Sequence, residues 1–293
     1  MVMQKGDSTM KKFSLIGLGL IVAGGIIFSI GYSRAEQNIT DIFFSRNTDK
    51  TYTKLISEYD KISAYGNINL TIKSGSKFTI TSTDSKNHPL AYKVQNGTLE
   101  LRQDNNESSF STNFQMGELS RLSFVTVTVP SHQLTKVDGL DNRFSLKLKH
   151  YSNKLPLDIT GWGNVKIKDV NAKSIHVRGI EDRVSISDST FNGDASQIDS
   201  GGDYVDLHNS SFKSLFVKTT TGNVNLDRPT IENHLSVITD TGNIFTKLKK
   251  SEDAKLEVKT SGPKPSVKTA TKVINPDKQY KFRSNTGTIK VLD

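Results

Sequence analysis

The chain has 293 residues, with 39 Lys and Arg against 30 Asp and Glu, a net charge of +9, and no cysteine. This length is sufficient for one or two domains with a buried core, so a miniprotein that depends on cross-links is excluded. The lack of cysteine excludes disulfides, thiolate zinc sites, thiol redox chemistry, a cysteine nucleophile and a lipidated N-terminal cysteine.

The first predicted element is a transmembrane helix at residues 13–32. This segment carries no charge, and as a helix it would rise about 30 Å, the thickness of a bilayer's hydrocarbon core. Lysines precede it and only Arg34 follows closely, so the positive-inside rule predicts cytoplasmic residues 1–12 and an extracytoplasmic C-terminal part. We therefore expect a single-pass protein of the cell membrane. A cleaved signal peptide, with Ser33-Arg34-Ala35 as the cleavage site, is the alternative.

The next two segments differ in pattern. Residues 33–60 are polar, mixed in charge and interrupted by short apolar patches, which predicts a juxtamembrane linker or a short helix. From residue 61 onward, short runs of alternating apolar and polar residues are separated by turn residues, which is typical of strands. We expect residues 61–140 to form an N-terminal β region that covers or extends the sheet of the following part.

Residues 141–293 contain two repeated units. One unit of five residues recurs at a mean spacing of 20 residues, with copies that begin at Asn142, Gly163, Asp182, Asp203, Gly222 and Gly242. In the second unit, apolar and polar residues alternate before Thr or Ser and then Gly, with copies that begin at Leu215, Leu235, Leu256 and Tyr280. This spacing predicts an all-β fold, a β-solenoid, because each coil must return about 4.8 Å above its start.

The repeats also predict which side chains are buried. One internal column is expected from Phe144, Val165, Val184, Val205, Val224 and Ile244, and the next from Leu146, Ile167, Ile186, Leu207 and Leu226. The residues between the columns are expected to face solvent; they are Ser145, Lys166, Ser185, Asp206 and Asn225. Gly or Asp at the start of each unit is expected to supply the unusual backbone angles of the turn. Pro263, Pro265 and the long interval before Gly287 predict a looser C-terminal region.

Several of these features together resemble a known family. They are the N-terminal anchor, the strand Val125-Thr126-Val127-Thr128-Val129-Pro130, the following Lys136-Val137-Asp138-Gly139, and the recurring Thr-x-Thr-Gly-Asn units. The chain resembles, over about residues 61–293, the LiaG-like putative adhesin family of bacterial envelope proteins. The resemblance implies a β-solenoid displayed outside a bacterial membrane and associated with envelope stress or two-component systems. It offers no catalytic residues.

We predict no catalytic, cofactor-binding or metal-binding residues. Seven acids lie from Glu181 to Asp206 against one base; we interpret them as turn residues, with a calcium site or a carboxylate pair as the alternative. His176 and His234 hold similar places in coils that are three apart, so they are not expected to share a metal. Trp162, the only tryptophan, is interpreted as a turn-packing residue, with a carbohydrate-stacking platform as the alternative.

The charge is distributed unevenly. From Lys247 to Asp293 there are twelve bases and five acids, a net charge of +7. Outside a bacterial membrane, this excess favours contact with anionic cell-wall polymers or lipid headgroups. The alternative is that these lysines keep the solenoid soluble and block edge-to-edge association. Nucleic acid is not an expected partner, because the charged part lies outside the cell.

We therefore expect an adhesin-like binding or scaffolding element of the cell envelope, not an enzyme, held in the membrane by residues 13–32. One alternative is an accessory sensor of envelope stress that acts with a membrane signalling protein. A second is a carbohydrate-active enzyme that uses a face formed by Asp199, Asp203 and Asp206.

Overall fold

The computed structural model describes residues 50–84, 90–103, 123–141, 144–193, 195–202, 204–249, 254–268, 275 and 277–292. The anchor predicted at 13–32 and residues 33–49 of the expected linker lie outside this set. All elements in the described part are strands. Within that part, the structure contains no helix with the length and apolar character needed to span a membrane.

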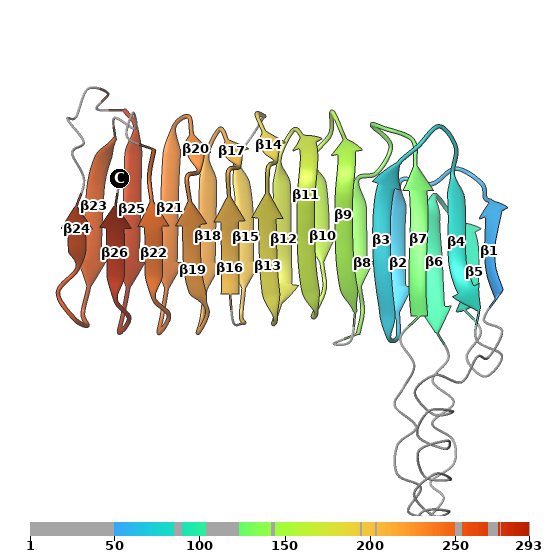
Figure 1. The fold of residues 1–293 in the computed structure, drawn as a ribbon, viewed down its shortest axis with the longest axis horizontal. Helices are drawn as coiled ribbons and strands as arrows, with labels where there is room; N and C mark the ends of the chain where they lie inside the picture. The colour runs from blue at the N-terminus through green and yellow to red at the C-terminus, as the bar shows by residue number, and fades with distance from the viewer. Residues whose placement is uncertain are drawn as a thin grey trace, which may run out of the picture. The chain divides into compact units, whose positions relative to one another are not determined.

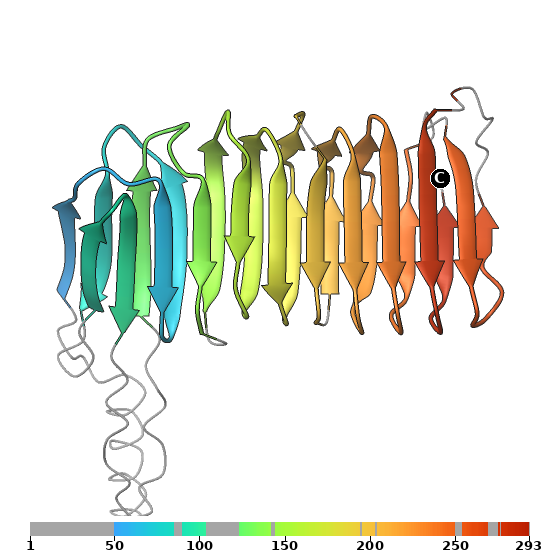
Figure 2. The ribbon, with the colours of Figure 1, turned by 180° about the vertical axis from the view of Figure 1, so that it is seen from behind.

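The strands form two sheets that face each other (Figures 1 and 2). Sheet A contains, in spatial order, β1 (Lys50–Leu55), β4 (Thr79–Asp84), β7 (Ser123–Val129), β3 (Ile68–Ser74), β9 (Ser145–Ser152), β11 (Asn164–Ala172), β13 (Arg183–Ser187), β16 (Tyr204–His208), β19 (Asn223–Asp227), β22 (Ile244–Lys247), β26 (Ile289–Leu292) and β24 (Ser266–Lys268). Beside β11 it continues into the short strands β14 (Thr190–Phe191), β17 (Ser211–Phe212) and β20 (Thr230–Ile231).

Sheet B supplies the opposite wall. In spatial order it contains β23 (Lys255–Thr260), β25 (Gln279–Ser284), β21 (His234–Thr239), β18 (Leu215–Thr219), β15 (Ser196–Ser200), β12 (Ile175–Ile180), β10 (Leu157–Thr160), β8 (Lys136–Gly139), β2 (Lys61–Tyr65), β6 (Thr98–Gln103) and β5 (Leu90–Gln95). Apart from the short strands β14, β17 and β20, the chain alternates between the sheets from β8 to β22, so each coil gives one main strand to each wall. We call such a coil a rung.

The expected interior of stacked aliphatic residues is confirmed over most of the repeat. Val184 pairs with Val205 and Val205 with Val224 in successive parallel strands, and all three side chains are at most 1% exposed. Because alternate residues point to opposite faces, a slip of one residue would turn this column into solvent. Burial of each valine or leucine contributes about 1.5–3 kcal/mol. One 20-residue period of the sequence therefore corresponds to one rung of the solenoid.

The first copy of the repeat is offset from the expectation by two residues. Leu146, not Phe144, pairs with Val165, and Leu148 pairs with Ile167. Phe144 is still buried, at 2% exposed, because a shift of two residues preserves the inward direction. Its ring occupies space left by a glycine: a Cβ added to Gly139 would lie 2.1 Å from a ring carbon of Phe144.

At the N-terminal end, spatial order departs from chain order. The β2–β3 rung lies between the β6–β7 rung and the β8–β9 rung, all in parallel register. The antiparallel strands β4, β1 and β5 then cover β7, β4 and β6 respectively. Strand β1 falls within residues 33–60, where we expected a linker or a short helix. It forms a strand because its alternating threonines bond across the pair, as in Thr53 to Thr81 at 2.8 Å.

The C-terminal end is rearranged in the same way. The β25–β26 rung pairs with β21 and β22 on one side and with β23 and β24 on the other. The last rung in the sequence is therefore the second-last in space, which accounts for the long interval between Gly242 and Gly287. Pro263 and Pro265 lie between β23 and β24 in the terminal rung, where they remove no ladder hydrogen bond.

Glycine is needed in the later turns for close approach, not for the backbone angles we expected. Among the described glycines only Gly66, Gly97 and Gly179 have positive φ. At Gly242, by contrast, an added Cβ would lie 1.9 Å from the carbonyl oxygen of Gly222 in the next rung. The hydroxyl of Thr239 accepts from the Gly242 N–H at 2.9 Å and donates to the Gly222 carbonyl at 3.2 Å. This explains the recurring Thr or Ser before Gly.

A corner with left-handed backbone bends sheet A in successive rungs. Its residues have φ between 45° and 54°; they are His150, Asp169, Asp188, Asn209 and Arg228. Asp and Asn tolerate this conformation better than most residues. Beyond the corner, the rings of Phe191 and Phe212 stack with centroids 5.1 Å apart, so the short strands β14 and β17 add an aromatic layer to the core.

Candidate binding surfaces

The acidic stretch does not form one catalytic face. Asp199 lies on β15 in sheet B and Asp206 lies on β16 in sheet A, so the two carboxylates are on opposite walls; Asp203 is outside the described residues. A carboxylate of Asp206 is 3.5 Å from Nε of Arg183 in the neighbouring strand. The alternative of a shared Asp199/Asp203/Asp206 face therefore does not hold for the two residues that can be placed.

The histidines hold the places that the repeat predicted. His176 on β12 and His234 at the start of β21 lie in the same sheet, three strands apart. Nδ1 of His176 is 2.9 Å from a carboxylate oxygen of Asp158. Across the described ranges, no group of three or more His, Asp or Glu side chains is positioned to hold a metal ion.

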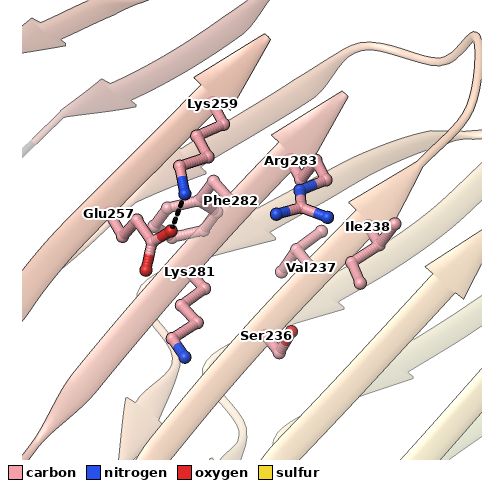
Figure 3. A pocket seen from close by; sticks show the side chains of 8 residues that line it. All are labelled: Ser236, Val237, Ile238, Glu257, Lys259, Lys281, Phe282 and Arg283. Carbon is pink, nitrogen blue, oxygen red and sulfur yellow. Dashed lines mark ion pairs between the residues drawn. The ribbon is translucent and has the colours of Figure 1, made fainter. Parts of the chain in front are cut away.

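The C-terminal basic excess is divided between the two walls. On sheet B its residues line a shallow groove of about 150 Å³ over β21, β25 and β23 (Figure 3). The lining residues are Ser236, Val237, Ile238, Glu257, Lys259, Lys281, Phe282 and Arg283. We call this the C-terminal groove. At the start of the basic stretch, Lys247 and Lys249 lie outside the lining and Lys250 lies outside the described residues.

One carboxylate partly offsets the charge of the C-terminal groove. Nζ of Lys259 is 2.7 Å from Oε1 of Glu257, drawn as the dashed line in Figure 3. The hydrogen bond from Lys259 and its charge lower the pKa of Glu257, and the charges of Lys281 and Arg283 act in the same direction. Among the described residues, Lys281 and Arg283 have no ion pair. The groove therefore keeps two positive charges, those of Lys281 and Arg283, that could bind an additional anionic group.

A stronger cationic surface lies on sheet A, where the sequence had not directed attention. Five exposed lysines project outward from three neighbouring strands: Lys73 on β3, Lys147 and Lys149 on β9, and Lys166 and Lys168 on β11. We call them the lysine grid. Lys73 pairs with Lys149 and Lys149 with Lys168, while Lys147 pairs with Lys166. Adjacent strands are about 4.8 Å apart, so each lysine has a like charge directly beside it.

A few rungs further on, the outward side chains of sheet A include neighbours of opposite charge. Beyond the grid, Arg183 approaches Asp206, and Nδ1 of His208 is 2.6 Å from a carboxylate oxygen of Asp227. In the described part of the chain, none of the five grid lysines forms an ion pair. Like charges that face each other directly across strands are destabilising. The grid therefore lowers stability unless anions are bound to it.

The two-residue offset explains why sequence analysis missed the grid. The repeat aligned Ser145 with Lys166, which separates the lysines of the two strands. The register that forms places Lys147 beside Lys166. Aligning Leu146-Lys147-Leu148-Lys149 with Val165-Lys166-Ile167-Lys168 would have shown the grid.

The fold and its surfaces define a β-solenoid with outward cationic faces. The chain belongs to the Toastrack DUF4097 family, whose profile matches residues 59–291. This confirms the resemblance to the putative adhesins.

Solved structures support the same fold. A "putative adhesin" from Bacteroides fragilis is 17% identical, with 83% of this chain and 96% of that chain covered and a TM-score of 0.51. A "putative adhesin" from Parabacteroides distasonis is 12% identical at the same coverage, with a TM-score of 0.55. At these identities the likeness concerns the fold alone. No functionally curated protein matches the chain in sequence.

Proposed function

We propose that this protein is an adhesin-type binding and scaffolding element of the bacterial cell envelope, anchored by residues 13–32 with the solenoid outside the membrane. Its ligands are anionic cell-wall polymers with repeated phosphate groups. The observation that carries this proposal is the lysine grid: five exposed ammonium groups on one rigid face, without ion pairs among the described residues.

The chemistry of the grid favours a polymer over a single small anion. One exposed ion pair at 4 Å contributes only about 1 kcal/mol in water. A chain with repeated phosphates makes several such contacts at once, so the second and later contacts form at high effective concentration. The lysines stand on paired strands of the sheet, so little backbone ordering is needed on binding. Binding should weaken as salt rises.

The C-terminal groove offers a second contact for the same class of ligand. Lys281 and Arg283 project from β25 without a carboxylate partner among the described residues, whereas Lys259 is occupied by Glu257. The placement of Asp199 and Asp206 on opposite sheets argues against the carboxylate face of the carbohydrate-active alternative.

The test uses the full chain in detergent and measures its binding to poly(glycerol phosphate), with neutral dextran as the reference polymer. Changing the five grid lysines to glutamine should weaken binding by at least about tenfold, equal to 1.4 kcal/mol. A matched control changes five exposed lysines elsewhere to glutamine: Lys61, Lys93, Lys154, Lys213 and Lys264. Because both variants lose the same net charge, equal binding by both would contradict the role of the grid.

The contribution of the groove is measured separately. The variant K259Q/K281Q/R283Q should bind more weakly than the wild type and remain sensitive to salt. If it binds like the wild type, the groove is not a contact for this polymer, and the proposal then depends on the grid alone.

A further inference from the structure

Exposed apolar residues gather along one edge of the solenoid. Three exposed residues lie where sheet B leads into sheet A in three neighbouring rungs. Tyr65 is the last residue of β2, and Leu140 and Trp162 lie in the turns after β8 and β10; their exposed fractions are 52%, 56% and 51%. The backbone joins the first two of these positions directly, because the N–H of Leu140 donates to the carbonyl of Ala64 at 2.8 Å. We call these three residues the apolar edge.

Two further exposed aromatic residues lie near the same edge. Phe124 and Tyr204 stand at the starts of β7 and β16, where sheet A strands begin. Scattered exposed hydrophobic residues need no explanation, but a contiguous group marks an interaction surface. Trp and Tyr, with an apolar ring and a polar group, are the residues that collect where a membrane meets water.

The chain enters the described part at this edge. Strand β1 pairs antiparallel with β4, and β4 pairs antiparallel with β7, so β1 runs in the direction of β7. Lys50 at the start of β1 is therefore at the same edge as Ser123 at the start of β7, and both strands begin at the lower edge in Figure 1. Ile68, which follows the Tyr65 turn, pairs with Ser123.

The number of residues between the predicted anchor and β1 limits how far this edge can lie from a membrane. Residues 33–49 separate the predicted membrane span from β1. Seventeen residues reach at most about 60 Å when fully extended, so with the proposed anchor in place Lys50 is tethered within that distance of the bilayer. The edge that carries Lys50 also carries the exposed Trp162.

We propose that the apolar edge lies on the outer surface of the bilayer, with Tyr65, Leu140 and Trp162 inserted at the level of the lipid headgroups. This inference rests on the anchor in the proposed function. Asp141 follows Leu140 in the chain, and the N–H of Glu181 bonds to the carbonyl of Trp162. Because these two acidic residues would not attract anionic lipid, the proposed contact is driven by the burial of the apolar side chains. The lysine grid then faces the space directly above the headgroups.

Trp162 is the only tryptophan in the chain, so its fluorescence reports on the apolar edge alone. The full chain is reconstituted into phosphatidylcholine vesicles made with ordinary lipids or with lipids brominated near the headgroup end of the acyl chains. We expect the brominated lipids to quench the Trp162 emission. We also expect the emission to lie at shorter wavelength in vesicles than in the denatured chain.

Substitutions by glutamine test the other edge residues. The double variant Y65Q/L140Q should lose most of the quenching. Leu155, 44% exposed in the turn between β9 and β10 at the opposite edge, supplies the control, because L155Q should be quenched like the wild type. Equal thermal midpoints of the three proteins would show that the changes do not unfold the chain.

The outcomes separate this inference from the proposed function. A chain that carbonate extracts from the vesicles refutes the anchor, and the bilayer contact with it. A chain that resists carbonate but shows no quenching refutes the bilayer contact alone. Quenching that is equal in Y65Q/L140Q and the wild type also refutes it, as does a concentration-dependent blue shift without lipid, which would indicate a second copy of the chain at the edge.

Discussion

Two buried tyrosines allow a stability prediction with an internal control. The hydroxyl of Tyr151 accepts hydrogen bonds from the N–H groups of Leu134 at 2.9 Å and Gln133 at 3.3 Å, and donates to the carbonyl of Pro130 at 3.3 Å. It thus fixes the connection between β7 and β8. The hydroxyl of Tyr59 is also buried, but it has no hydrogen-bond partner among the described residues; its ring packs on Phe78 at 5.0 Å.

The substitution Tyr151→Phe should lower the free energy of unfolding by about 1–3 kcal/mol. It leaves the N–H of Leu134, a fully buried residue, without its acceptor, and an unsatisfied buried donor has this cost. The same change at Tyr59 removes a hydroxyl that bonds to nothing described, so Tyr59→Phe should be neutral or stabilising. The two changes delete the same atom, so their difference isolates the hydrogen bonds.

Urea denaturation followed by circular dichroism measures both effects on the full chain in detergent. The expected result is a lower midpoint for Tyr151→Phe and an unchanged or higher one for Tyr59→Phe, with equal slopes. Equal losses in both variants would refute the reasoning, because the hydroxyl contacts would then not decide the stability.

Three other measurements check the packing and the titration. Gly202→Ala places a Cβ 1.2 Å from the carbonyl oxygen of Glu181 and should lower the free energy of unfolding by about 3 kcal/mol. Gly201→Ala is the control: a Cβ there has nothing within 4 Å, so the melting temperature should stay within a few degrees. Equal shifts in the two variants would contradict the rung spacing. Phe212→Ala removes a stacked, buried ring and should lower the unfolding free energy by about 3–5 kcal/mol; a loss below 1 kcal/mol, measured by urea titration, would argue against the aromatic layer. Burial raises the pKa of Tyr59 and Tyr151. An unfolded tyrosine has a pKa of about 10, so the unfolded chain releases these protons at lower pH than the folded chain does. The free energy of unfolding is therefore unaffected by the two groups below about pH 10 and falls as pH rises towards the folded pKa. Melting temperatures across alkaline pH should therefore fall less steeply in Tyr59→Phe than in the wild type, and parallel curves would refute this.

The sequence was sufficient to predict the interior of the solenoid. The register of Val184, Val205 and Val224 follows from their spacing, because alternation forces every second residue inward and stacking forces equal residues together. The rearranged ends could not be predicted. The local sequence of β25 does not indicate that this strand pairs with both β21 and β23. That arrangement arises from strand pairing between segments that are distant in the sequence.

The candidate surfaces were predictable in charge but not in place. The count of bases after Lys247 indicated the C-terminal groove region, yet it cannot show which side chains share a face. The lysine grid depends on the offset that puts Lys147, not Ser145, beside Lys166. The apolar edge depends on which turns are adjacent, since Tyr65 and Leu140 are far apart in sequence and become neighbours only through the out-of-order N-terminal rungs.

The out-of-order rungs at both ends also restrict how such a chain can change in length. A coil added after β26 could not stack directly on β26, because β22 and β24 already flank this strand. It would have to reach past the terminal rung to β23 and β24, the outermost described strands of the two sheets. A coil inserted between β11 and β22, where chain order and spatial order agree, needs no such crossing. The rungs at the two ends would then stay the same, and the number of coils between them would set the distance between the apolar edge and the C-terminal groove.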